Sequence, residues 1–218
     1  SATADMVLVA VGARPENSLA RDAGIVTGIK GAIKVDRQMR TNLPDIFAAG
    51  DCVETWHKIL QEYTYMPLGS TAHKQGRVAG ENMAGEDAEF QGTLGTQAVK
   101  IFNLVAAGTG LRDKTAGDEG FDPLTVEFET WDHKVYYPGA QKMRIRLTGD
   151  RSSHRILGAQ IVGHVPSEVS KRIDVLAAAI YNDMKVADLS DIDLSYTPPL
   201  SSPWAPVQLA AQAWNKKI

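Results

Sequence analysis

The sequence has one cysteine, Cys52, among 218 residues. A single thiol cannot form a disulfide within the chain, so we expect a reducing, cytoplasmic setting. Long apolar runs are also absent, because none approaches the roughly 20 residues that cross a bilayer. No basic stretch followed by an apolar one stands near the N-terminus, so the sequence indicates no secretory leader. We therefore expect no membrane partner.

Neither sign of charge dominates the composition. The 23 Lys and Arg residues and the 26 Asp and Glu residues are interspersed, and the formal net charge is −3. Because no basic stripe is present to bind a polyanion, we expect no nucleic-acid partner. The five histidines are scattered, without the spacings that metal ligands show. We therefore predict no metal site.

The glycine-rich turn G-x-G-x-x-G is missing. Without this turn and the helix N-terminus behind it, the chain lacks the usual place for the phosphates of a dinucleotide. The chain also begins at Ser1, a few residues before the apolar run Met6–Val11. A lone strand cannot satisfy its own edges. We therefore expect the C-terminal part of a longer protein, the alternative being a complete small protein that happens to start in a strand.

The composition is sufficient for a folded core. Apolar residues make up 44% of the chain and charged residues 22%, which is typical of one to two domains. In the first region we expect a buried strand at Met6–Val11 and a short helix at Asn17–Ala23. Short strands are expected at Ile33–Val35 and Ile46–Ala49. A helical pattern then runs over residues 70–85.

The pattern changes after the polar segment Glu86–Gly92, so we expect one region at residues 1–90 and a second at 91–218. Five strands are expected there, at Ala98–Phe102, Leu104–Ala107, Leu124–Trp131, Met143–Leu147 and Ile156–Val162. Their short connections favour an antiparallel sheet with one face in water.

Helices are expected beside this sheet. A short one is predicted at Arg112–Gly117. An apolar stripe with helical spacing runs the length of Pro166–Met184. The last helix is expected to begin near Trp204 or Ala205 and to run through Trp214. The predicted fold class is therefore α+β, with the helices of the second region packed on one face of its sheet.

The stretch Thr41–Cys52, TNLPDIFAAGDC, ends an apolar strand in small residues and then supplies one carboxylate. Gly50 lets another chain or a ligand approach the backbone. Asp51 follows at the carboxyl end of the strand, where open α/β sheets bind ligands. We predict that Asp51 holds a hydroxyl of a cofactor.

The predicted helix at residues 70–85 has an unusually small face. Ala72, Gly76 and Gly80 share that face, and each glycine costs a helix about 1 kcal/mol relative to alanine. Something must therefore come close to the helix axis. A neighbouring helix and a cofactor both remain possible.

Three segments carry a family resemblance. They are Asp5–Glu16 (DMVLVAVGARPE), Thr41–Cys52 and Pro67–Gly85 (PLGSTAHKQGRVAGENMAG). Together they resemble the FAD-dependent pyridine nucleotide-disulfide oxidoreductases. The resemblance implies an α/β remnant of the FAD- and NAD-binding region, with FAD as cofactor and NAD(P)H as the electron donor of the whole protein. It also implies that Asp51 accepts hydrogen bonds from the ribityl chain of FAD.

The resemblance implies that the start of this helix faces the flavin. Reduced flavin gathers negative charge at N1 and at the C2 carbonyl, and a helix N-terminus offers free N–H groups with about half a positive charge. We predict that backbone N–H groups near Gly69–Ala72 face the pyrimidine edge of the flavin. The predicted cofactor-binding residues are Gly50, Asp51, Leu68, Gly69, Ser70, Thr71 and Ala72.

The second region is similar to the dimerisation domain of the same family, which implies a homodimer. The matching segments are GTGL at Gly108–Leu111, HKVYYPGA at His133–Ala140, ILGAQIVG at Ile156–Gly163, KRIDVLAAAI at Lys171–Ile180 and YTPPLSSPWAPVQLA at Tyr196–Ala210. They resemble most the coenzyme A-disulfide reductase, NADH oxidase and NADH peroxidase subgroup. That subgroup uses one redox cysteine, which the resemblance places in a missing N-terminal part. The segment YTPPLSS has no histidine, which argues against the members that use a histidine-glutamate dyad.

In the coenzyme A-disulfide reductases, tyrosines from two of these segments reach the active site of the partner subunit. By position, the candidates here are Tyr196 and either Tyr136 or Tyr137, of which only one can face inward; we take Tyr137. A phenol can donate a proton to a thiolate or peroxide oxygen. The residues Pro203, Trp204 and Ala205 replace the usual Ala-Lys-Asp, which puts coenzyme A recognition in doubt.

Cys52 follows the flavin motif directly. The redox cysteine of the family belongs to the missing part, so we expect Cys52 to have a structural role. The negative charge of Asp51 should raise the pKa of the thiol and make it less reactive.

Two functions remain open for the chain. In the first, it completes the flavin site and the dimer of an oxidoreductase that passes electrons from NAD(P)H through FAD to a small-molecule disulfide, persulfide, peroxide or oxygen. In the second, it is a non-catalytic dimerisation or binding module that is inactive in isolation.

Overall fold

A computed structural model describes residues 2–218, which form two compact units. The first unit comprises the chain up to Trp56 together with Tyr63–Gln91. The second unit comprises His57–Glu62 and Gly92–Ile218.

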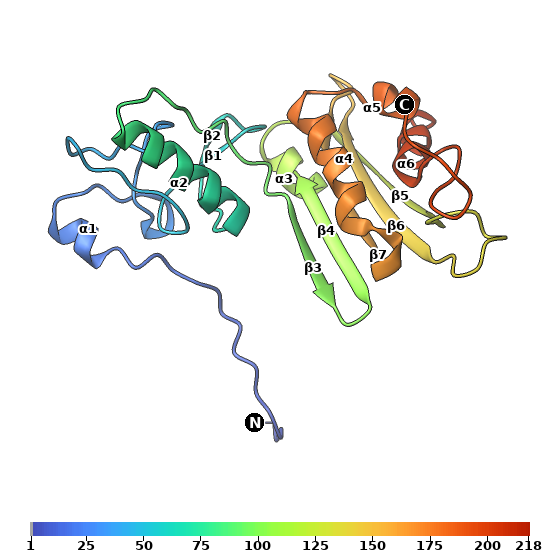
Figure 1. Ribbon diagram of the computed structural model, residues 1–218, viewed down its shortest axis with the longest axis horizontal. Helices are drawn as coiled ribbons and strands as arrows, with labels where there is room; N and C mark the ends of the chain where they lie inside the picture. Colours follow the sequence, from blue (N-terminus) through green and yellow to red (C-terminus); the bar gives the residue numbers. More distant parts are fainter. Residues whose placement is uncertain (1) are drawn as a thin grey trace. The chain divides into compact units, whose positions relative to one another are not determined.

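The first unit is built mainly from loops packed beneath one long helix. It contains α1 (Ser18–Asp22), the 3-10 turn η1 (Ile29–Gly31) and α2 (Gly69–Met83) (Figure 1). Both α-helices were expected from the sequence, and both are confirmed. Its core is a cluster of buried side chains formed by Ala20, Ile33, Val35, Met39, Val53, Val78, Ala79 and Phe90.

The strand predicted at Met6–Val11 is wrong. The apolar side chains of this segment are 73–89% exposed, and no described residue pairs with its backbone. A strand exists only through its hydrogen-bonded neighbours, and an apolar run does not supply them.

The strands predicted at Ile33–Val35 and Ile46–Ala49 are also wrong. Each segment makes only isolated bridges, between Ile33 and Val53 and between Arg40 and Phe47 for example. Residues with positive φ at both ends of the second segment, Asp45 (63°) and Gly50 (94°), turn the chain before a ladder can extend.

A hairpin that the sequence analysis missed connects the two units. Strands β1 (Thr55–His57) and β2 (Glu62–Thr64) form a two-stranded sheet. The rings of Trp56 and Tyr63 meet edge to face across it, with centroids 5.2 Å apart. The turn contains no glycine and instead places Gln61 at a φ of 55°.

The second unit contains the predicted antiparallel sheet. Its strands are β3 (Gln97–Ile101), β4 (Leu104–Gly110), β5 (Pro123–Trp131), β6 (Lys142–Asp150) and β7 (Ile156–His164). They lie in the order β3-β4-β7-β6-β5, and every neighbouring pair is antiparallel. Strand β3 is an edge strand whose five residues are all exposed.

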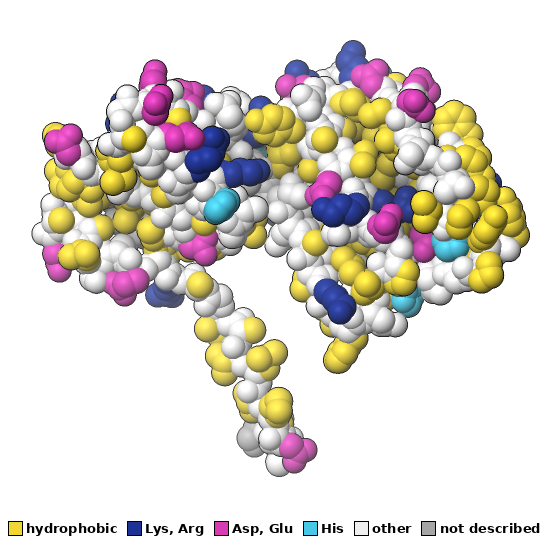
Figure 2. All heavy atoms as spheres, in the orientation of Figure 1, with side chains coloured by type: hydrophobic (Ala, Val, Ile, Leu, Met, Phe, Trp, Pro, Cys, Tyr) yellow, Lys and Arg dark blue, Asp and Glu magenta, His cyan; other side chains and the backbone are white. Residues whose placement is uncertain are grey.

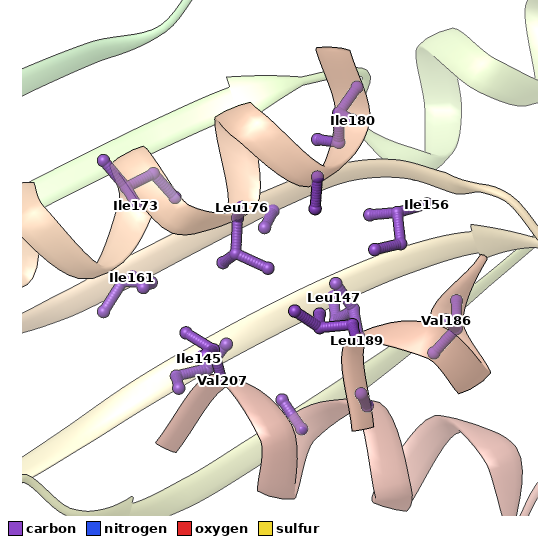
Figure 3. Close-up of a cluster of buried hydrophobic side chains, with 14 of the residues drawn as sticks. Ile145, Leu147, Ile156, Ile161, Ile173, Leu176, Ile180, Val186, Leu189 and Val207 are labelled. Carbon is purple, nitrogen blue, oxygen red and sulfur yellow. The ribbon is translucent and has the colours of Figure 1, made fainter. Parts of the chain in front are cut away.

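Helices α4 (Val169–Tyr181), α5 (Val186–Asp191) and α6 (Pro206–Asn215) pack on one face of this sheet, as predicted (Figures 1 and 3). Figure 3 shows side chains of α4 and α6 converging on β6 and β7. The labelled core residues are Ile145, Leu147, Ile156, Ile161, Ile173, Leu176, Ile180, Val186, Leu189 and Val207.

The helical segments differ from the predictions at their boundaries. Residues 165–167 form a separate 3-10 turn, η2 (Val165–Ser167), and α4 ends before Met184 because Asp183 has a φ of 55°. The short α5 was not expected. The predicted short helix is confirmed as α3 (Asp113–Asp118). Within residues 2–218 no helix has the length and apolarity needed to cross a membrane.

Candidate functional site

The Gly50–Val53 turn lies against the start of α2. Gly50 has a φ of 94°, and a Cβ built on it would stand 3.7 Å from the Cβ of Ala72. The amide of Val53 donates to the carbonyl of Gly50 at 3.2 Å, which closes the turn and leaves Asp51 exposed. Asp51 therefore lies in a turn and not at a strand end, but the fold does bring it to the helix start.

Gln75 ties this turn to α2. Its side chain is fully buried; Oε1 accepts from the amide of Gly50 at 3.1 Å, and Nε2 donates to Oγ1 of Thr55 at 3.3 Å. Since a buried amide side chain must satisfy its hydrogen bonds, the two contacts fix the position of the 50–55 segment. Gln75 was not predicted from the sequence, where its one signal is a long polar residue among small ones.

The first turn of α2 has fewer free donors than predicted. The amides of Thr71 and Ala72 both donate to the carbonyl of Leu68 at 2.9 Å. The amides of Gly69 and Ser70 precede these first hydrogen bonds of the helix, and both residues are exposed. Gly69 and Ser70 are thus the two positions where backbone N–H groups can meet a ligand.

The small face of α2 is open. A Cβ built on Gly76 or Gly80 would meet no described atom within 4 Å outside the helix itself. Of the two occupants left open by the sequence, a neighbouring helix is not present among residues 2–218. A bound group or another protein segment can therefore approach the helix axis here.

Two side chains near Asp51 respond to its charge. Desolvation by burial, with a smaller contribution from Asp51, raises the pKa of Tyr65, whose ring centroid lies 5.8 Å from Nζ of Lys30. Burial likewise raises the pKa of Cys52, with Asp51 adding to the effect. The expected direction for Cys52 is confirmed, although burial is the larger cause. A raised thiol pKa suits a structural cysteine.

The second unit holds the loop of Tyr137 through a buried carboxylate. Asp132 is 2% exposed; its Oδ2 accepts from Oγ of Ser167 at 2.7 Å, and its Oδ1 accepts from the amide of Gln141 at 3.0 Å. Nδ1 of His133 lies 2.9 Å from the same Oδ1. These contacts close the loop between β5 and β6 at both ends.

Arg172 joins that loop to the segment that carries Tyr196. Its guanidinium donates to the carbonyl of Asp132 at 2.9 Å, to that of Ser167 at 2.9 Å and to that of Leu200 at 3.2 Å. Burial lowers the pKa of Arg172 from its usual value. The amide of Lys134 also donates to the carbonyl of Pro198 at 3.2 Å. The two tyrosine-bearing segments are therefore held side by side.

The predicted tyrosines lie on a partly apolar rim. Tyr137 is 39% exposed and Tyr196 is 42% exposed, whereas Tyr136 is 69% exposed. We define the tyrosine rim as the exposed residues Val135, Tyr136, Tyr137, Tyr196, Leu200 and Trp204. Figure 2 shows hydrophobic side chains gathered at this edge of the second unit. Contiguous exposed apolar patches are common at interaction surfaces.

No group of three or more metal-ligating side chains occurs within the described chain. The candidate functional residues form two separate groups: Asp51 with the start of α2 in the first unit, and the tyrosine rim in the second.

Comparisons with known proteins agree with this description. Residues 1–76 match the family model described as pyridine nucleotide-disulphide oxidoreductase, and residues 96–206 match the model of the dimerisation domain of these proteins. The chain is 36% identical to an NAD(P)H sulfur oxidoreductase (CoA-dependent) of Pyrococcus furiosus, covering 96% of this chain and 47% of that protein. It is 34% identical to a coenzyme A disulfide reductase of Staphylococcus aureus, covering 91% and 45%. The chain thus spans about half the length of these curated relatives.

Solved structures show the same likeness. An NAD-dependent persulfide reductase from A. fulgidus superposes with a TM-score of 0.92 at 43% identity, covering 98% of this chain and 39% of that one. A water-forming NADH oxidase from Lactobacillus brevis superposes with a TM-score of 0.88 at 28% identity, covering 95% and 45%.

Proposed function

Because the chain belongs to the pyridine nucleotide-disulphide oxidoreductase family, we propose that it is the flavin-completing and dimerising C-terminal part of an oxidoreductase. The proposed reaction passes electrons from NAD(P)H through FAD to a disulfide, persulfide, peroxide or oxygen. The observation that carries the proposal is the 3.1 Å hydrogen bond from the Gly50 amide to Gln75. This bond fixes Asp51 next to the start of α2.

The residues present fit a flavin. The exposed carboxylate of Asp51 is an acceptor for ribityl hydroxyls, and the amides of Gly69 and Ser70 are donors for an electron-rich edge. The open face at Gly76 and Gly80 leaves room beside the helix axis. When bound, FAD supplies the transfer of electrons between donor and acceptor, while these residues bind and orient it.

In this proposal, residues 1–90 are the end of the NAD domain with the second FAD-binding segment, and residues 91–218 are the dimerisation domain. The tyrosine rim then faces a second copy of the chain, and Tyr196 and Tyr137 reach a small-molecule substrate on the partner subunit. The exposed apolar residues of the rim and the rigid pairing of its two segments support this role.

The second candidate is a dimerisation or binding module that is inactive in isolation, and the lack of a G-x-G-x-x-G turn in these residues fits it as well as it fits a fragment of an enzyme. The reading frame upstream of Ser1 discriminates between them. Two such turns and a cysteine there support the oxidoreductase, and their absence contradicts it.

The purified chain is expected to bind added FAD weakly and in a manner that depends on Asp51. Asp51→Ala should lower the affinity about tenfold, because it removes a charged hydrogen-bond acceptor. Quenching of flavin fluorescence measures the binding, and Asp22→Ala on α1 serves as the matched control. Equal affinities of the two variants contradict the role of Asp51. If the chain is purified with nearly one flavin per molecule, the prediction that the ADP-binding turn lies outside these residues is wrong.

The chain is expected to be a dimer at tens of micromolar in light scattering. Leu200→Glu, at a residue 65% exposed on the tyrosine rim, should weaken the dimer by at least about tenfold because the carboxylate is desolvated at the interface. Val99→Glu on β3, 52% exposed, should leave it unchanged. A monomeric unaltered chain, or equal effects of the two changes, contradicts the interface.

A further inference from the structure

The second unit contains a cavity that the proposed function does not use. It has a volume of about 340 Å³ and lies between the tip of the β1–β2 hairpin and the start of β7. The tyrosine rim lies at the other end of β7. Its loop joins β5 to the start of β6, and there Arg144 of β6 pairs with Val162, near the end of β7. The volume is within the range of sites for small organic ligands.

Apolar side chains form one part of the cavity lining, beside the polar and charged ones. Leu157 and Ile180 are only 2% and 3% exposed, and Ile59 and Phe121 are half-buried beside them. Ile59 and Phe121 also pack on the small core cluster that contains Leu157. The backbone around this part of the lining is therefore fixed by buried contacts, and the exposed parts of Ile59 and Phe121 are the apolar surface that a ligand can meet.

The cavity lining carries one positive charge without an ion-pair partner in the described chain. Nη1 of Arg155 lies 3.3 Å from Oδ1 of Asp183, so these two charges compensate each other. Lys58 has no carboxylate within ion-pair distance among residues 2–218; its Nζ lies 4.1 Å from the ring centroid of Tyr181. The amide of Lys58 donates to the carbonyl of Thr93 at 3.0 Å, which fixes the base of the side chain.

Two residues on the wall have a backbone conformation that side chains rarely adopt. Gln61 and Asp183 both have a φ of 55°. Such residues persist only where the surroundings hold them, and they are frequent around ligand sites. Here Gln61 lies in the turn that carries Lys58, and Asp183 is itself the ion-pair partner of Arg155.

We propose that this cavity binds a small molecule with an apolar body and a single anionic group, with the anion facing Lys58. The apolar wall takes the body by burying it from water. Among the described residues that line the cavity, Lys58 carries the one charge without an opposite charge in ion-pair distance, and its partly buried position reduces screening by solvent.

The test compares 4-phenylbutyrate with its neutral analogue 4-phenylbutan-1-ol on the purified chain. Calorimetry gives the affinities, and amide chemical shifts locate the bound molecule. The acid should bind about fivefold more tightly than the alcohol, as expected for one partly exposed charge pair. Lys58→Met keeps the aliphatic stem and should remove the difference between the two probes.

Two controls separate the charge of Lys58 from general effects. Lys100→Met on β3 should leave the preference for the acid intact. The double change Arg155→Gln with Asp183→Asn removes a compensated pair and should also leave it intact. Unchanged melting temperatures show that the variants are folded. Equal binding of acid and alcohol, chemical shifts away from the cavity, or no saturable binding of the acid overturns the proposal.

Discussion

Gly158→Ala is expected to lower the free energy of unfolding by about 3 kcal/mol, because the added methyl group has no space in a strand interior. A Cβ built on Gly158 would stand 2.0 Å from the carbonyl oxygen of Leu111 and 2.7 Å from its amide nitrogen. Both atoms belong to the backbone, and the amide of Leu111 donates to Leu157 at 2.8 Å. The chain can therefore relieve the clash only by breaking the join between β4 and β7.

Gly108→Ala is the matched control on the neighbouring strand. A Cβ there would lie 3.6 Å from the carbonyl oxygen of Ala159, an ordinary contact. Its cost should be within about 1 kcal/mol. Urea unfolding followed by circular dichroism measures both variants. Similar midpoints for Gly158→Ala and the unaltered chain contradict the predicted clash.

Arg172→Met is expected to cost about 3 kcal/mol of unfolding free energy, because three carbonyls lose a charged donor. These are the carbonyls of Asp132, Ser167 and Leu200. The change should also weaken the dimer, since the two segments of the tyrosine rim are no longer tied together. Lys171→Met is the control, because Lys171 is exposed and, among the described residues, forms its ion pair with Asp174 alone. Its effect on unfolding should stay within about 0.5 kcal/mol.

Denaturant unfolding and light scattering test both parts of this prediction. If Arg172→Met unfolds like Lys171→Met, the guanidinium does not hold the loops. If Arg172→Met unfolds at a lower denaturant concentration but dimerises normally, dimerisation through the tyrosine rim does not require Arg172 to hold the two segments together.

The sequence was most informative where local chemistry decides the structure. The small-residue spacing and the closing glycine predict α2 to within two residues, and the alternating strands of the second unit predict its sheet. These predictions depend on the spacing of side chains along one face, which repeats every 3.6 residues in a helix and every 2 residues in a strand. The apolar stripe of α4 likewise predicts which of its residues pack on β4 and β7.

The failures have a common physical origin. Met6–Val11 has the composition of a strand, but a strand also needs a neighbouring segment to which its backbone can hydrogen-bond, and the composition does not show whether one is present. The hairpin of β1 and β2 was missed because its turn uses Gln61 in place of glycine. Gln75 and Arg172 each organise the candidate residues of their own unit, yet their roles come from burial, which no local pattern reports. Asp51 was recognisable because a short motif surrounds it.

The exposed segment Met6–Val11 has a consequence for the isolated chain in solution. It is a run of six apolar residues, half of them valines, with no charge and no proline, the composition from which cross-β pairing between molecules starts. Its side chains are 73–89% exposed. Residues 6–11 are therefore a segment through which isolated copies of the chain can associate, and removing them should reduce aggregation of the isolated chain.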